Sequence, residues 1–135
     1  MSQRAVQTSA APPPVASYSQ GVRFGDMFQV AGQGPKDSAT GRYVEGGIKE
    51  QTRQTLENVR HILTAAGGSF ADVVMVRIYL ADRDDFALMN EVYAEYVSEP
   101  FPARTTVYVG LPPDMLVEID VLATLNRDRE EGATA

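Results

Sequence analysis

The clearest hydrophobic pattern in the chain has the period of a helix. Between residues 48 and 66, the side chains expected on one face recur at intervals of three and four positions: Ile48, Thr52, Leu56, Val59, Ile62, Leu63 and Ala66. This spacing predicts an amphipathic α-helix that buries the stripe. Gly67 and Gly68 follow directly, and glycine readily takes the left-handed conformation that ends helices.

A second helix is predicted over residues 82–99. Its expected buried stripe consists of Phe86, Met89, Tyr93, Tyr96 and Val97. Either Asp82 or Asp84 can cap its first turn with a carboxylate, and the prolines at positions 100 and 102 end it. Asn90 interrupts the stripe in mid-helix, where either a solvent contact or a pocket wall would explain an amide.

Short runs of β-branched and aromatic residues predict the strands. Residues 22–24 and 27–30 flank a Gly-Asp turn and indicate a β-hairpin. Residues 72–82 form one strand, which is expected to present four side chains on one face: Val74, Val76, Ile78 and Leu80. Residues 105–109 and 116–124 complete the set. The order is β-β-α-β-α-β-β, an α+β arrangement in which the last two strands would, by sequence alone, pair as a hairpin.

The length of 135 residues suits one hydrophobic core. We expect an extended lead-in over residues 1–16, because its three consecutive prolines favour a solvated, extended chain. A single domain over 17–125 and a polar tail over 126–135 would follow. The sequence has neither a secretory signal nor an apolar run long enough for a membrane span, so a cytoplasmic location is expected.

Composition narrows the chemistry. The net charge is −6 and the basic residues are scattered, which argues against nucleic acid, whose phosphates require clustered cations. The same scatter leaves no basic helix for a membrane surface. The absence of cysteine excludes disulfides and thiolate catalysis. His61 is the only histidine and lies outside the helical stripe, so neither a His-based metal site nor a Ser-His-Asp triad is expected.

Arg104 and Glu118 are charged side chains at or within segments that otherwise resemble buried strands. Arg104 lies where a strand begins, and its guanidinium can grip a carboxylate with two hydrogen bonds. A salt bridge at a surface or interface would also explain it. Glu118 lies between Val117 and Ile119 and shares its parity with Asp120. A carboxylate on an inner sheet face needs a partner, whereas an exposed face needs none, so both alternatives stay open.

Six short segments, taken together, resemble one protein family. They are Y-S-Q-G at 18–21, V-A-G-Q at 30–33, Q-T-x-x-x-L-x-N-V at 51–59, D-F-x-x-x-N-x-x-Y at 85–93, F-P-A-R at 101–104 and V-E-I-D at 117–120. In this order they make the chain resemble the RidA/YjgF/UK family from about Tyr18 to Ala123. The resemblance implies a mixed β-sheet with two helices packed on one face, similar to bacillary chorismate mutase, with the last strand inserted between earlier strands. It also implies a homotrimer with ligand clefts between subunits.

The same resemblance implies an activity. Arginine-bearing members of the family are enamine/imine deaminases, which hydrolyse reactive 2-iminoacids to 2-oxoacids and ammonia without a cofactor or a metal. By position, Arg104 matches the residue that anchors the substrate carboxylate, and Glu118 matches the acidic residue that holds or activates water. Pocket positions of the family are matched by Tyr18, Ala31, Gly32, Asn90 and Thr106. Ala31 stands where serine is common and Thr106 where cysteine is common, which leaves the substrate preference open.

Other functions remain open from the sequence. Relatives in the family deaminate aminomuconate-like or aminoacrylate-like catabolic intermediates. Outside enzymes, the alternative is a trimer that binds small acids, or acts like a holdase, with little turnover. The family also has a reputation for RNA cleavage, against which the net negative charge counts. Arg104 and Glu118 together favour the deaminase, because a simple binder needs the arginine but not the carboxylate.

Overall fold

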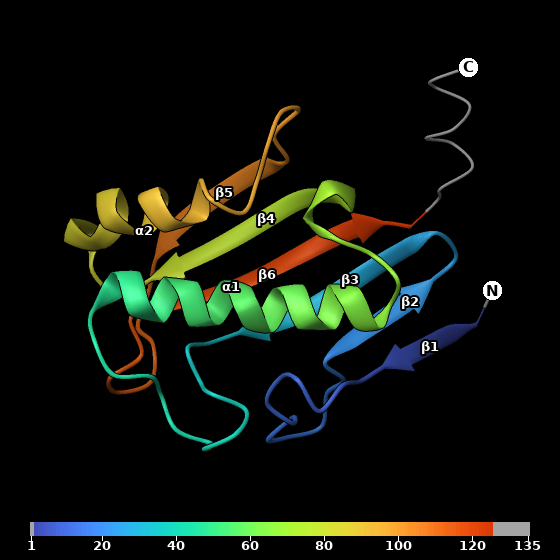
Figure 1. Cartoon of the computed structure of the whole chain (residues 1–135), viewed down its shortest axis with the longest axis horizontal. Helices are drawn as coiled ribbons and strands as arrows, with labels where there is room; N and C mark the ends of the chain where they lie inside the picture. The colour runs from blue at the N-terminus through green and yellow to red at the C-terminus, as the bar shows by residue number, and fades with distance from the viewer. Residues whose placement is uncertain (1, 126–135) are drawn as a thin grey trace.

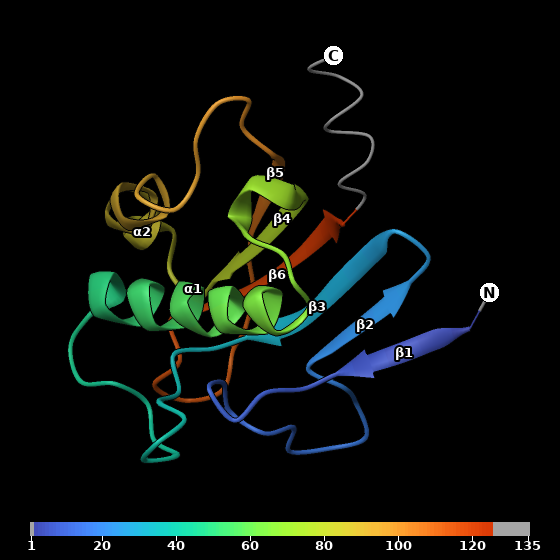
Figure 2. The same ribbon diagram turned by 45° about the vertical axis from the view of Figure 1, so that its right-hand side comes forward.

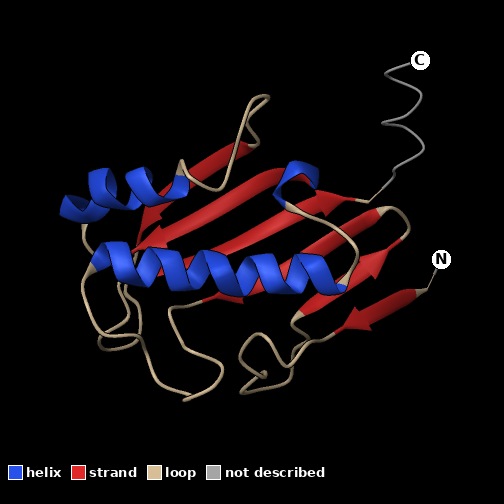
Figure 3. Ribbon diagram, viewed as in Figure 1, coloured by secondary structure: helices blue, strands red, loops and turns tan. Residues whose placement is uncertain are grey.

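A six-stranded mixed sheet carries both helices on one face (Figures 1 and 3). The computed structural model describes residues 2–125. Its strands are β1 (Gln3–Val6), β2 (Gly21–Phe24), β3 (Met27–Gln33), β4 (Val73–Leu80), β5 (Ala103–Tyr108) and β6 (Val117–Thr124). Its helices are α1 (Ile48–Ala65) and α2 (Phe86–Tyr93), with 3₁₀ turns η1 (Phe70–Asp72) and η2 (Arg83–Asp85). The predicted α+β class with two helices on one face is therefore confirmed.

The spatial order of the strands is β1-β2-β3-β6-β4-β5. β6 pairs antiparallel with both β3 and β4, and β5 pairs parallel with β4. Parallel neighbours need a crossover, which α2 supplies between β4 and β5. The hairpin suggested by sequence order alone is wrong, and the inserted last strand implied by the family resemblance is confirmed. The last strand in the chain thus lies inside the sheet (Figure 1).

The hydrophobic core lies between the helices and the covered face of the sheet. Figure 2 shows α1 and α2 on the same side of the strands. The predicted stripe of α1 is buried from Ile48 to Leu63, and Ala66 packs against the core just beyond the helix. Gly67 follows with φ of +84°, which is the left-handed conformation that its type predicted. From β6, the alternate residues Val117, Ile119 and Val121 are all fully buried.

Three details of the predicted elements are wrong. Val74 is 41% exposed, although it was expected to share a face with Val76, Ile78 and Leu80, which are fully buried. The pairing of β4 with β6 shifts register between Val73 and Met75, and such a bulge turns the alternation by one residue. The second helix is shorter than predicted, because it ends at Tyr93. Phe86, which was expected in the buried stripe, is 36% exposed. Tyr96 and Val97 of the same stripe still pack against the core from the following turn.

The first residues of the chain belong to the sheet. A solvated lead-in over 1–16 was expected, but β1 pairs antiparallel with β2 and Ala11 is 1% exposed. The predicted domain start at residue 17 is therefore too late. The expected polar tail over 126–135 lies outside the described residues. None of the described helices is both long enough and apolar enough to cross a membrane.

Gln20 ties this first segment to the domain. Its side-chain oxygen accepts a hydrogen bond from the backbone N–H of Thr8 at 2.7 Å. Its amide nitrogen donates to three backbone carbonyls, those of Thr8, Ala11 and Pro12, at 3.1, 3.2 and 2.8 Å. The side chain is only 2% exposed. A buried amide with four backbone contacts fixes the path of a segment that has little regular structure of its own.

Replacing Gln20→Met should therefore destabilise the protein by about 1–3 kcal/mol, because it leaves buried backbone groups without partners. Urea unfolding measures the loss, and hydrogen exchange should localise it to residues 8–12. The matched control is Gln7→Met, since Gln7 is exposed and should tolerate the change. Equal stability of the two variants would show that this amide does not hold the segment.

Candidate active site

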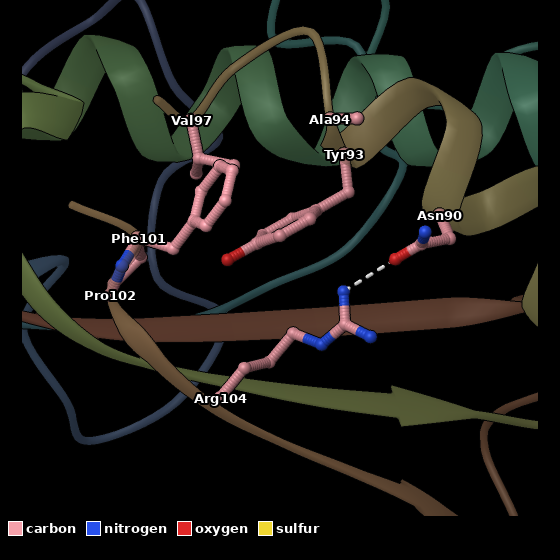
Figure 4. Close-up of a pocket in the computed structure, with 7 residues that line it drawn as sticks. All are labelled: Asn90, Tyr93, Ala94, Val97, Phe101, Pro102 and Arg104. Carbon is pink, nitrogen blue, oxygen red and sulfur yellow. Dashed lines mark hydrogen bonds between the residues drawn. The ribbon is translucent and has the colours of Figure 1, made fainter. Parts of the chain in front are cut away.

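Arg104 lies on the edge strand β5 and points to the helical side of the sheet. It is paired in register with Val76, whose side chain is fully buried beneath the helices. The guanidinium donates a hydrogen bond from Nη1 to Oδ1 of Asn90 at 2.6 Å (Figure 4). The guanidinium carbon, Cζ of Arg104, lies 4.9 Å from the ring centre of Tyr93 and 5.5 Å from that of Phe86. A neutral amide and two aromatic faces therefore orient this cation without neutralising it.

A cavity of about 270 Å³ opens beside this guanidinium. Its lining consists of Asn90, Tyr93, Ala94, Val97, Phe101, Pro102 and Arg104. Within residues 2–125 no carboxylate forms an ion pair with Arg104, so no salt bridge among these residues explains it. The arginine is thus a fixed cation on a mostly apolar wall, an arrangement suited to a small anion with an apolar part. Asn90 faces this cavity rather than open solvent. Of the two explanations that the sequence offered for this amide, the pocket wall therefore holds.

Glu118 lies on the other face of the sheet. It pairs in register with Tyr79 of β4, and its strand neighbours Val117 and Ile119 point into the core. A second cavity, of about 230 Å³, is lined by Glu118 together with Tyr18, Gly32, Lys36 and Tyr43, among others. Glu118 makes no hydrogen bond or ion pair within the described part of the chain. Burial, and secondarily the nearby charge of Asp120, raise the pKa of Glu118 above its ordinary value.

Gly32 makes room for that carboxylate. The pairing of β3 with β6 is irregular between Val30 and Gln33, and this break sets Gly32 against the side chain of Glu118. A Cβ on residue 32 would overlap the carboxylate oxygen Oε2. The glycine is therefore favoured here by a close approach to a side chain rather than by its backbone angles. Ala31 precedes it, and its N–H donates to the carbonyl of Gln20 at 2.8 Å.

The structure sorts the predicted site residues into two groups. Arg104 and Asn90 share the first cavity, whereas Tyr18, Gly32 and Glu118 share the second. Thr106 lies two residues beyond Arg104 on the same face of β5, and its hydroxyl is buried without a hydrogen-bond partner among the described residues. Ala31 adjoins the second group through Gly32. Within one chain, the arginine and the glutamate do not face a common space.

Sequence reasoning missed several residues of both groups. In the first cavity it assigned Tyr93 to packing alone and gave Phe101 no role. In the second it did not identify Lys36 or Tyr43. It also left open whether Glu118 and Asp120 share an exposed face, and Asp120 proves to be 8% exposed and hydrogen bonded. The alternation of residues along β3, β4 and β6 could have indicated which side chains meet on one face of the sheet. That comparison is possible only when the strand order is known.

The close approach of Gly32 to Glu118 gives a direct test of this geometry. Gly32→Ala should fold, because the overlapping atoms belong to the end of a flexible side chain, but it should displace the carboxylate. We expect an altered carboxyl titration of Glu118 in ¹³C NMR, with a change in melting temperature of only a few degrees. Gly110→Ala is the matched control, since nothing lies within 4 Å of the Cβ added there. An unchanged Glu118 signal in the Gly32 variant would contradict the contact.

Comparison with known proteins supports a single family. The family described as Endoribonuclease L-PSP matches residues 8–125. A RutC family protein of Pyrococcus horikoshii is 53% identical, over 86% of this chain and 93% of that protein. A 2-iminobutanoate/2-iminopropanoate deaminase of Capra hircus is 40% identical, over 89% of this chain and 88% of that protein.

A solved structure shares the fold as well as the sequence. The crystal structure of E. coli TdcF with bound serine superposes with a TM-score of 0.84 at 36% identity, covering 90% of this chain and 98% of that one. The family match spans nearly all of the described residues, including both cavities. The chain therefore belongs to the Endoribonuclease L-PSP family, which is the RidA/YjgF family that its motifs resemble.

Proposed function

We propose that this protein is an enamine/imine deaminase that hydrolyses small 2-iminoacids to 2-oxoacids and ammonia. The observation that carries the proposal is Arg104, a fixed guanidinium beside a cavity with no carboxylate partner in the described chain. Such a group is a receptor for the carboxylate of a small acid. The deaminase name of a relative at 40% identity and the serine bound to a structural relative agree with this chemistry.

The two cavities are expected to meet between subunits of a homotrimer. In one chain Arg104 and Glu118 lie on opposite faces of the sheet and in separate hollows. A substrate held by the arginine of one subunit can reach the glutamate of its neighbour only if the edge strand β5 of the first packs against the open sheet face of the second. Val107 and Tyr108 at that edge are 38% and 42% exposed, which leaves apolar surface for such a contact.

The reaction needs orientation and proton transfer more than a strong nucleophile. Arg104 would hold the substrate carboxylate, so that the electrophilic carbon of the iminium faces a water molecule beside Glu118. As the C–O bond forms, the π electrons of the C=N bond move to nitrogen and Glu118 takes the proton from water. Glu118 then returns that proton to nitrogen, the C–N bond breaks, and ammonia leaves as the hydroxyl collapses to the 2-oxo group. The hydroxyl proton leaves with ammonia as ammonium.

The raised pKa of Glu118 suits both of its roles. A group that first accepts and then donates a proton works best when its pKa lies near the working pH. An ordinary glutamate has a pKa that is too low for the second step, and burial moves it in the favourable direction. No histidine is needed for this proton transfer, in accord with the single histidine of the chain.

The alternatives predict different ligands. An aminomuconate-like or aminoacrylate-like substrate would use the same carboxylate anchor, so only an activity screen distinguishes it. A small-acid binder would need Arg104 but would be indifferent to Glu118. Cleavage of RNA, to which the family description refers, is disfavoured by the net charge of −6, because a polyanion requires clustered cations.

The first activity prediction concerns the anchor. Arg104→Met should lower kcat/KM for 2-iminobutanoate by about 10- to 100-fold, which corresponds to the loss of a charged hydrogen bond worth about 1.5–3 kcal/mol. The measurement is the rate of 2-oxobutanoate release when the protein is added to a threonine dehydratase reaction. Arg4→Met, which removes an exposed arginine of β1, is the control. If both variants accelerate release as the wild type does, the deaminase assignment is wrong.

The second activity prediction concerns Glu118. Glu118→Gln should lower kcat by about 10² to 10⁴, the usual contribution of acid–base assistance. Wild-type activity should fall on the acid side as Glu118 becomes protonated, at a pH above that of an ordinary glutamate because its pKa is raised. The variant should lose this limb of the pH profile, and Glu45→Gln on the exposed surface should keep it.

Stability provides an independent readout for the same variant. A carboxyl whose pKa is raised by folding favours the folded state at low pH, and this contribution is lost as pH rises through the raised pKa. Glu118→Gln should therefore melt at a higher temperature than the wild type at pH 8, and at nearly the same temperature at pH 4. Full activity in this variant would remove Glu118 from the mechanism but leave the role of Arg104 intact.

A further inference from the structure

Beside Glu118, the open face of the sheet carries a hydrogen-bonded group of side chains that the proposed chemistry does not use. At its centre is Asp120, whose carboxylate accepts from Nε of Arg77 at 2.8 Å and from the hydroxyl of Tyr79 at 2.8 Å. The amide of Gln29 approaches the same carboxylate at 3.4 Å and also donates to the carbonyl of Val121 at 3.0 Å. Three strands, β3, β4 and β6, thus contribute to one buried acid.

Strand register places Arg77 within reach of two carboxylates. Arg77 pairs with Asp120, and Tyr79 pairs with Glu118. Arg77 is therefore the diagonal neighbour of Glu118, at a Cβ separation of about 7–8 Å that a long side chain can span. An arginine in this position can form an ion pair with either acid.

The side chain of Arg77 is committed to Asp120. Its ion pair with Asp120 measures 2.8 Å, with 12% of the aspartate side chain and 47% of the arginine side chain exposed. Tyr79 points its hydroxyl along the other diagonal, toward Asp120, although its backbone lies opposite Glu118. Glu118 consequently receives no hydrogen bond or ion pair from either side chain.

We propose that Asp120 is a positioning residue that holds Arg77 away from Glu118, so that Glu118 keeps no cation partner and remains free to exchange a proton with the substrate. The proposal rests on the proposed function for the catalytic purpose that it gives to Asp120. Its physical content is that Arg77 pairs with Asp120 and not with Glu118. A glutamate paired with arginine would stay ionised and could not return a proton to the departing amine. Asp120 would thus act on the reaction only through its neighbours.

Several other groups face Glu118 or line its cavity. Across the sheet they are Tyr79 and, on the diagonal, Arg77, while along its own strand the nearest charge is Asp120. From β3 it meets Gly32, which has no side chain. The remaining titratable lining of its cavity is Tyr18, Lys36 and Tyr43. None of these forms an ion pair with Glu118 in the described chain. Lys36 and Arg77 are the cations among them, and Arg77 is the one that Asp120 holds.

The test is the titration of Glu118 itself, followed by ¹³C NMR of side-chain carboxyls and assigned with Glu118→Gln. Asp120→Asn should move the midpoint of Glu118 to lower pH by at least about one pH unit, because it removes a negative charge and frees Arg77 to bind Glu118. Arg77→Met with Asp120→Asn should recover part of that change, since no arginine is then available. Arg77→Met alone should move the midpoint in the opposite direction.

Equal midpoints for Asp120→Asn and for the double variant would overturn the proposal, because Arg77 would then have no part in the effect. If the variants that carry Asp120→Asn fail to fold, Arg77→Met alone still tests the proposal, because a Glu118 midpoint that does not rise in that variant would contradict it. Glu95→Gln, which breaks the exposed pair between Arg53 of α1 and Glu95 in the turn after α2, is the matched control and should leave Glu118 unchanged. Light scattering on each variant separates these effects from a change of assembly.

Activity adds a readout that a merely structural role would not move. In Asp120→Asn the acid limb of the kcat profile should follow the NMR midpoint of Glu118 to lower pH, and the double variant should return it part of the way. The NMR titration needs no turnover, so a shifted midpoint in a protein that lacks deaminase activity would refute the proposed function and leave this inference standing. An unshifted midpoint in an active enzyme would do the reverse.

Discussion

The central place of β6 in the sheet is the constraint on which the rest of the structure depends. A strand with neighbours on both sides presents alternate residues to opposite faces. On the covered face, Val117, Ile119 and Val121 complete the core under the helices. On the open face, the same alternation fixes two carboxylates, Glu118 and Asp120, among groups from β3 and β4. The stability of the core and the position of the acids therefore cannot be changed independently.

The position of Arg104 in the sheet differs from that of the two acids. It lies on an edge strand, where one side of the backbone has no neighbour within the described chain and space remains for a cavity. Asn90 and the rings of Tyr93 and Phe86 determine its direction but do not cancel its charge. The cost of half-burying an unneutralised guanidinium is limited by these contacts and by water. The arginine thus remains available to an anion from outside the chain.

Helices were the easiest elements to predict, because periodicity is a local property of the sequence. The stripe of α1 and the left-handed glycine that follows it agree with expectation. The face of Val74 was predicted wrongly because a bulge against β6 changes the alternation. No residue type within β4 indicates that bulge. The strand at the chain start was missed for a related reason. Residues 3–6 are mostly exposed, so they lack the hydrophobic pattern by which strands are recognised.

For the site, the sequence by itself determined which chemical groups are available: Arg104 at the start of a strand, two acids of the same parity, a lone histidine and no thiol. Through its motifs it also determined the family to which the chain belongs. Tertiary structure alone decided that Arg104 and Glu118 occupy separate cavities, and that Arg77 pairs with Asp120 rather than with Glu118. The physical reason is that both outcomes depend on strand order and register, which are set by long-range pairing between segments far apart in the chain.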